Sequence, residues 1–202
     1  LRYHDNEILC VVDSVFAGKN ISCVSIINKD IPIVKNISEA NLMGANVLLL
    51  GVLTSGGHRP KSWDNVIIEA LKFGMSIING LHDQVYPDFS KYLIKKSQWI
   101  WDTRVPSFIP KIGSAKAADL KNKRVLMIGT DMAAGKMTVG LELFSYLKGK
   151  QINSGFVATG QVGITISGNG IPLDAYKLDH ACGAVETAVL EQKEKEIIII
   201  EG

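Results

Sequence analysis

Residues 129–138 read GTDMAAGKMT and stand between an apolar segment, 124–128, and an amphipathic segment, 136–148. A strand, a glycine-containing turn and a helix start form the setting in which many proteins bind phosphate groups. The glycines let backbone N–H groups face one anion, the helix N-terminus adds positive potential, and Lys136 reaches toward the outer phosphate oxygens. The pattern therefore predicts a phosphate-binding loop. Its expected cofactor contacts are Gly129, Thr130, Ala133, Ala134, Gly135, Lys136, Met137 and Thr138.

This loop departs from the usual phosphate-loop pattern at two places. Five residues rather than four separate Gly129 from Gly135, and Met137 stands where Ser or Thr normally holds magnesium. Thr138 offers a hydroxyl one position later, but one step along a helix turns the side chain by about 100°. Magnesium binding therefore stays an open alternative, with Thr138 and Glu201 as the expected ligands.

A second glycine-rich stretch follows the predicted strand 155–158 and continues for about 14 residues to Asp174, which is long for a plain connection. Ligands of parallel sheets bind where the strands end, and glycine lets a ligand approach the backbone closely. Asp174 is expected either to act as a base or ammonium partner, or to cap a predicted helix, 174–192. The stretch as a whole is either a ligand loop or a plain hairpin or lid. In the first case the substrate contacts are Thr159, Gly160, Gln161 and Ser167.

Strands and helices alternate along the whole chain, which predicts right-handed βαβ units and parallel sheets. Predicted strands cover 8–13, 31–34, 47–51, 76–79, 99–101, 124–128, 155–158 and 197–200; predicted helices cover 62–73, 88–96, 136–148 and 174–192. Prolines, glycine and lysines gather in 104–123, a composition typical of a linker. The sequence therefore predicts an α/β protein with two parallel-sheet domains, 1–110 and 124–202, joined by a linker, 111–123.

Two polar stretches of the first predicted domain invite a functional interpretation. Residues 56–59 read GGHR and either bind an anion through the backbone and Arg59 or simply turn the chain into the helix expected from Ser62. His82 and Asp83 follow a predicted strand and form either an ordinary loop or a catalytic pair. The first domain has no G-x-G-x-x-G fingerprint, so NAD binding is not predicted.

Composition narrows the classes of function. The 202-residue chain has 22 Lys+Arg against 20 Asp+Glu, a balance that argues against a nucleic-acid binder. No apolar run approaches the ~18 residues that a membrane span needs. Three widely spaced cysteines fit neither a disulfide framework nor a zinc site, so a cytoplasmic location is expected. A homo-oligomer is also expected. Because the chain opens on Leu1 and stops just after an apolar strand, we expect it to continue at both ends.

The phosphate loop, taken with Glu201-Gly202 at the end of a later strand, resembles the P-loop branch that includes dethiobiotin synthetase. More closely, the whole chain resembles a former domain-of-unknown-function family now described as D-glutamate N-acetyltransferase-like. The stretches that carry this resemblance are 1–3, 11–14, 51–57, 80–83, 101–104, 129–138, 156–161 and 201–202.

The resemblance implies a Rossmann-like N-terminal domain and a P-loop NTPase-like C-terminal domain. It also implies an enzyme that transfers an acetyl group from acetyl-CoA to the amino group of D-glutamate or a similar small amino acid. Such a reaction needs a base, for which Asp131, Asp174 and Glu201 are the candidates. Two alternatives stay open: an ATP- and magnesium-dependent ligase or kinase-like enzyme resembling dethiobiotin synthetase, and a nucleotide-binding module without turnover.

Overall fold

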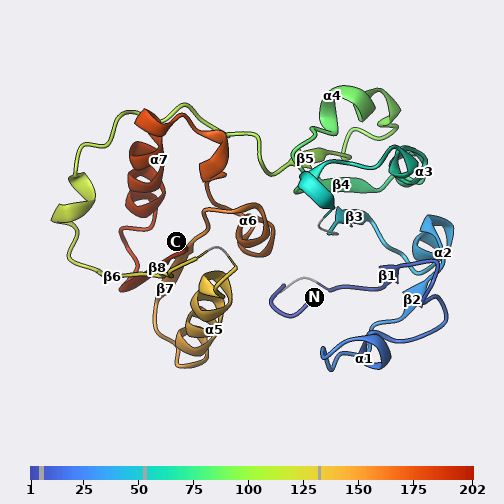
Figure 1. Ribbon diagram of the computed structural model, residues 1–202, viewed down its shortest axis with the longest axis horizontal. Helices are drawn as coiled ribbons and strands as arrows, with labels where there is room; N and C mark the ends of the chain where they lie inside the picture. The colour runs from blue at the N-terminus through green and yellow to red at the C-terminus, as the bar shows by residue number, and fades with distance from the viewer. Residues whose placement is uncertain (5–6, 52–53, 132) are drawn as a thin grey trace. The chain divides into compact units, whose positions relative to one another are not determined.

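The computed structural model describes residues 1–4, 7–51, 54–131 and 133–202. The chain divides into two compact units, Leu1–Asp102 and Thr103–Gly202 (Figure 1). Each unit is built from parallel strands and helices, so the α/β class with parallel sheets is confirmed. The division falls before residue 110, where the sequence places the end of the first domain.

The first unit contains a three-stranded parallel sheet in the order β3-β4-β5 and a separate parallel pair, β1 with β2. The strands are β1 (Val11–Val12), β2 (Ile33–Val34), β3 (Val47–Leu50), β4 (Ser76–Asn79) and β5 (Ile100–Asp102). The helices are α1 (Ile21–Val24), α2 (Ile37–Leu42), α3 (Asp64–Lys72) and α4 (Tyr86–Phe89). Single 3₁₀ turns cover Ser55–Gly57, Lys61–Trp63 and Ser90–Tyr92.

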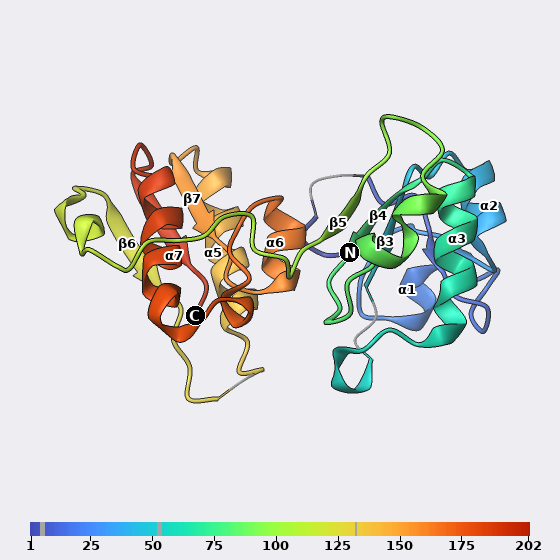
Figure 2. The same ribbon diagram turned by 90° about the horizontal axis from the view of Figure 1, so that it is seen from above.

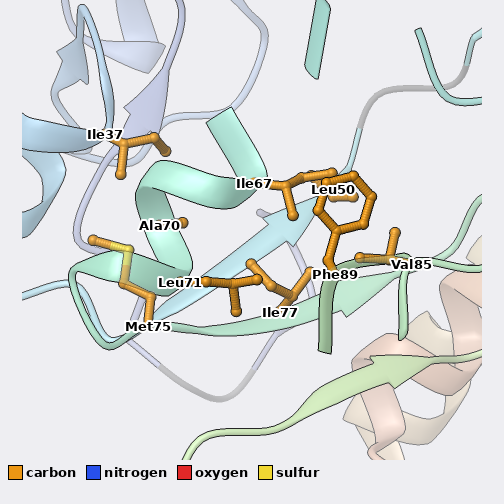
Figure 3. Packing of buried hydrophobic residues seen from close by; sticks show 9 residues of the cluster. All are labelled: Ile37, Leu50, Ile67, Ala70, Leu71, Met75, Ile77, Val85 and Phe89. Carbon is orange, nitrogen blue, oxygen red and sulfur yellow. The ribbon is translucent and has the colours of Figure 1, made fainter. Parts of the chain in front are cut away.

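Helix α3 anchors the core of this unit, and Figure 2 shows it beside strand β4. Ile67, Ala70 and Leu71 repeat at helical spacing and are fully buried. They point toward Ile77 of β4 and other apolar residues (Figure 3). The helix begins at Asp64 rather than near Ser62, because a 3₁₀ turn occupies the preceding residues.

The second unit has a parallel sheet in the order β6-β8-β7. Its strands are β6 (Lys123–Leu126), β7 (Ser154–Val157) and β8 (Ile197–Ile200), and its helices are α5 (Lys136–Gly149), α6 (Gln161–Ser167) and α7 (Leu178–Glu191). Two 3₁₀ turns cover Lys116–Asp119 and Leu173–Ala175.

Helices α5 and α7 cover opposite faces of this sheet (Figure 1). Ile198 and Val157 belong to the apolar cluster on the α7 side. Their neighbours Ile199 and Phe156 lie next to Gly140 of α5, as the alternation of side chains along a strand requires. Ile198 and Ile199 of the central strand β8 are fully buried, and all four residues of β7 are buried as well.

The segment expected to be a linker packs instead against α7 of the second unit. The Glu186 carboxylate of α7 accepts the Ser114 N–H at 2.7 Å and the Ala117 N–H at 3.2 Å. A side chain on Gly183 would overlap the Lys111 carbonyl, so this glycine lets the segment lie directly on the helix. The partners of the segment lie about 70 residues away along the chain, so its local composition gives no sign of this packing.

Within the described ranges, no helix is both long enough and apolar enough to cross a membrane.

Candidate functional site

Strand order brings the phosphate loop and Glu201 together. Strands β6 and β8 are parallel neighbours with Leu126 opposite Ile200, so the residues that follow each strand emerge at the same edge of the sheet. The Met127 N–H donates to the Ile200 carbonyl at 2.9 Å and extends this pairing toward the loop. Residues that lie about 70 positions apart in the sequence therefore form one surface.

The backbone of the loop turns sharply just before helix α5 begins. Ala133 and Gly135 both have positive φ, at 56° and 89°, and the helix starts at Lys136. The Lys136 Nζ donates to the Asp131 carbonyl at 3.0 Å, which folds the side chain back over the loop. Met132 belongs to the predicted loop but lies outside the described residues. Lys136 and the two residues with positive φ therefore lie at the N-terminal end of α5, where the helix dipole is positive.

Glu201 is a partly buried carboxylate beside the loop. Burial raises its pKa above the ordinary value of 4.5, while hydrogen bonds from the Thr159 and Gly160 N–H groups and the charge of Lys136 act in the opposite direction. The Thr159 N–H lies 3.0 Å from Oε2. The carboxylate therefore ties the end of β7 to the end of β8, next to the loop lysine.

The second glycine-rich stretch is not a plain loop, because residues 161–167 form helix α6. Its Gly163, Ile164 and Thr165 are buried, and a side chain on Gly163 would overlap the Glu201 carboxylate. Glycine and β-branched residues are poor helix formers, which hides this helix from propensity reasoning. Tertiary packing of Gly163 against Glu201 and Ala158 stabilises it instead.

The candidate substrate residues are only partly brought together. Thr159 and Gly160 lie against Glu201, and Gln161 opens helix α6. Ser167 closes that helix, about 9 Å along its axis, and its Oγ donates to the Gly163 carbonyl at 2.8 Å.

Asp174 lies in a 3₁₀ turn whose Leu173 N–H donates to the Thr159 carbonyl at 3.0 Å, and it does not cap the predicted helix 174–192, because α7 begins at Leu178. Its carboxylate pairs with Arg104. A guanidinium partner holds the charge of Asp174 in place.

The candidate metal ligands have different surroundings. Thr138 is exposed on the first turn of α5, whereas the carboxylate of Glu201 is engaged with backbone N–H groups. Among the described residues, no three His, Cys, Asp or Glu side chains gather where one metal ion would bind all of them.

An apolar hollow of about 260 Å³ borders the phosphate loop. Its lining residues are Leu126, Met127, Ile128, Ala134, Gly135, Lys136 and Val139. Sequence reasoning missed this feature. The available signal was the apolar residue Ile128 directly before the predicted phosphate loop.

In the first unit, the Arg59 guanidinium already has carboxylate partners, so it is not open to the anion that the sequence allowed for. Its guanidinium pairs with Asp64 and with Asp88, and it lies over the ring of Phe89 at 4.6 Å from the centroid. Only 12% of the side chain is exposed, so Arg59 serves as an anchor of its loop.

Comparison with known proteins gives a consistent result for both units. Residues 14–106 match the family model described as a domain of unknown function, DUF1611_N, Rossmann-like domain. Residues 111–202 match the one described as DUF1611_C, P-loop domain. A crystal structure of a DUF1611 family protein from Anabaena variabilis superposes with a TM-score of 0.92 at 38% identity, covering 100% of this chain and 59% of that one.

Two curated relatives carry a functional name. A protein of Pseudoalteromonas sp, named D-glutamate N-acetyltransferase, is 37% identical over 169 residues, which is 83% of this chain and 50% of the relative. A protein of Tritonibacter scottomollicae with the same name is 34% identical over 168 residues, covering 82% and 50%. The chain thus spans about half the length of the curated relatives it matches. On these matches, the chain belongs to the DUF1611 family, in which a Rossmann-like N-terminal domain precedes a P-loop C-terminal domain.

Proposed function

We propose that this protein transfers an acetyl group from acetyl-CoA to the amino group of D-glutamate or a similar amino acid. The observation that carries the proposal is the pairing of a phosphate loop with an adjacent apolar hollow at one edge of the second unit. The names of the two curated relatives support the same reaction. Because the chain covers half of each relative, the proposal concerns the whole protein of which these units are part.

Coenzyme A suits this edge because it combines charge with an uncharged arm. Its pyrophosphate and 3′-phosphate are ligands for backbone N–H groups, for the N-terminus of the 14-residue helix α5 and for Lys136. Lys136 would exchange the Asp131 carbonyl for a phosphate oxygen. The hollow lined by Leu126, Ile128 and Val139 offers an apolar wall for the arm.

Met137 is compatible with this proposal. A loop that holds CoA binds its phosphates without transferring them, so the hydroxyl that normally holds magnesium is dispensable there. A loop that performs phosphoryl transfer depends on magnesium to neutralise the developing charge. The identity of residue 137 therefore favours acetyl-CoA over ATP as the ligand of the loop.

The chemistry of the proposed reaction is a nucleophilic substitution at a thioester. The neutral amine attacks the carbonyl carbon, a C–N bond forms, the C–S bond breaks, and CoA leaves as a thiolate that takes up a proton. The amino group must first lose a proton to a base. The Glu201 carboxylate accepts hydrogen bonds from the Thr159 and Gly160 N–H groups, and the Asp174 carboxylate pairs with Arg104. Either carboxylate would have to give up part of these contacts to accept a proton.

The experiment that tests the proposal measures thiol release from acetyl-CoA by the whole protein with D-glutamate and, separately, with L-glutamate. Mass spectrometry identifies the N-acetyl product. Lys136→Ala is expected to abolish turnover, whereas Lys150→Ala, at the opposite end of α5, is expected to leave it unchanged. Release of phosphate from Mg-ATP without any thiol release would contradict the proposal and favour the ligase alternative.

A further inference from the structure

Two loops of the first unit meet at the carboxyl ends of strands β3 and β4. The His82 N–H donates to the Gly57 carbonyl at 2.9 Å. Gly57 has φ of 69°, and a side chain there would overlap the ring of His82. The close approach therefore requires glycine and fixes the loop that carries His58 against the loop that carries Asp83. In open α/β sheets this edge is where ligands bind.

His58 and Asp83 form an ordered pair across these loops. One carboxylate oxygen of Asp83, Oδ2, accepts the Arg59 N–H at 2.7 Å, and the other, Oδ1, lies 3.0 Å from His58 Nδ1. These contacts lower the pKa of Asp83, with the backbone hydrogen bond as the largest cause. An ionised carboxylate only accepts hydrogen bonds, so Nδ1 of His58 carries the proton that they share. Nε2 then presents its lone pair, on a side chain that is 70% exposed.

Buried polar side chains of strands β4 and β5 support the loop that carries Asp83. The Asn79 amide of β4 donates to the Asp83 carbonyl at 2.8 Å and to Asp102 Oδ1 of β5 at 2.7 Å. Asp102 in turn accepts the N–H groups of Val85 and Tyr86, at 2.8 and 2.9 Å. Asn79 is fully buried and Asp102 nearly so. A surface loop with this much buried support is preorganised, which is what a group acting on a ligand needs.

Charge defines the class of ligand. Three carboxylates lie beside one guanidinium charge: Asp64 and Asp88 pair with the Arg59 guanidinium, and Asp83 accepts the backbone N–H of Arg59. The other titratable ring nearby is His82, whose centroid lies 6.2 Å from that of His58. An excess of negative charge beside an imidazole lone pair favours a primary ammonium group over a phosphate or a carboxylate.

We propose that His58, oriented by Asp83, binds the ammonium group of the amino acid acceptor and accepts its proton. In this step an ammonium N–H bond breaks, its electron pair stays on nitrogen, and the proton forms a bond to His58 Nε2. The Asp83 carboxylate stabilises the resulting imidazolium, as a carboxylate does in other His–Asp pairs. The first unit supplies every residue of this site. The identification of the ligand as the acceptor amine rests on the acetyltransferase function proposed above.

Kinetics of His58→Ala test the catalytic part. We expect kcat for acetylation of D-glutamate to fall by about 10²–10⁴-fold, the usual contribution of a general base. The affinity for acetyl-CoA is expected to stay unchanged, and added imidazole is expected to restore part of kcat. Lys72→Ala, at the exposed C-terminal end of α3, provides the control and should keep wild-type activity. Retention of kcat by His58→Ala, or a loss that imidazole does not relieve, would overturn the proposal.

A nuclear magnetic resonance experiment separates this site from the acetyltransferase function. The ¹⁵N shifts of His58 should show a protonated Nδ1, and Asp83→Asn should remove that preference. Addition of D-glutamate should shift the Nε2 signal of His58 and leave His180 unaffected. If the protein acetylates no amine but this shift occurs, the function fails and the ammonium site stands. If the protein acetylates D-glutamate and His58 does not respond, the site is refuted.

Discussion

Replacing Gly163 with alanine probes the contact between helix α6 and the Glu201 carboxylate. The new Cβ would overlap Oε2 of Glu201 and lie 3.1 Å from the Cβ of Ala158. Both neighbours belong to strand ends that are fixed by backbone pairing, so the helix must move or the carboxylate must turn. Either response separates Thr159 from Glu201 and disturbs the edge of the sheet beside Lys136.

Two opposing effects determine the size of the change. Alanine favours a helix over glycine by about 1 kcal/mol, and overpacking a buried site costs about 1–3 kcal/mol. Gly149, in α5, provides the matched control, because a Cβ there would have no atom within 4 Å. Gly149→Ala should stabilise the protein by up to about 1 kcal/mol. Gly163→Ala should therefore be less stable than Gly149→Ala by about 1–3 kcal/mol.

Thermal unfolding followed by far-ultraviolet circular dichroism measures this difference. One kcal/mol corresponds to about 4–8 °C in a unit of this size. Glu201→Ala removes the clashing carboxylate, so Gly163→Ala should be less harmful in that background, with a coupling of about 0.5–3 kcal/mol. If Gly163→Ala stabilises the protein as much as Gly149→Ala does, Glu201 does not lie against α6 and the description of the site is wrong.

Two further predictions concern pH and the buried network of the first unit. Because burial raises the pKa of Glu201, its ionisation costs stability as the pH rises above 4.5, so Glu201→Gln should raise Tm at pH 7 and have little effect at pH 3. Hydrogen bonds lower the pKa of Glu186, so its ionised carboxylate contributes stability above pH 4.5 that is lost as the pH falls. Glu186→Gln should therefore lower Tm at pH 7 only. Equal changes of Tm in the two variants would contradict both pKa directions. Asp102→Ala should cost about 3 kcal/mol or more, since it removes one hydrogen bond of the Asn79 amide and the acceptor of two backbone N–H groups. Urea unfolding monitored by tryptophan fluorescence measures this cost, because all three tryptophans lie in the first unit; an unchanged midpoint would refute the network.

The features of the fold that rest on periodicity follow from the sequence. Apolar runs predict the central strands, including 76–79 and 197–200, which the structure places at β4 and β8. The alternation of strands and helices predicts parallel sheets, which the structure confirms. Helix α5 begins where the phosphate-loop pattern places it. These elements are stabilised by the same apolar faces that make them recognisable.

The features that depend on distant partners do not follow from the sequence. Helix α6 forms because Gly163 fits against Glu201, which lies 38 residues further along the chain. Residues 111–117 belong to the second unit because Glu186 and Gly183 of α7 receive them. The pairing of His58 with Asp83 depends on two loops that meet only in the folded sheet. Local composition carries no record of such contacts.

The structure brings only some of the candidate site residues together. It brings Lys136, Thr159, Gly160 and Glu201 to one edge of the second unit. The carboxylate of Asp174 pairs with Arg104, which lies 70 residues earlier in the chain. The adjacency of strands β6, β8 and β7 explains why the four residues meet. The ion pair of Asp174 and Arg104 forms only when the chain has folded, because the two residues lie far apart in the sequence.

Calorimetric titration of the whole protein with acetyl-CoA tests the central claim most directly, with Mg-ATP titrated in parallel. We predict that acetyl-CoA binds, that Lys136→Ala abolishes this binding, and that Lys150→Ala retains it. Binding of Mg-ATP without acetyl-CoA, or unchanged acetyl-CoA affinity in Lys136→Ala, would contradict the account.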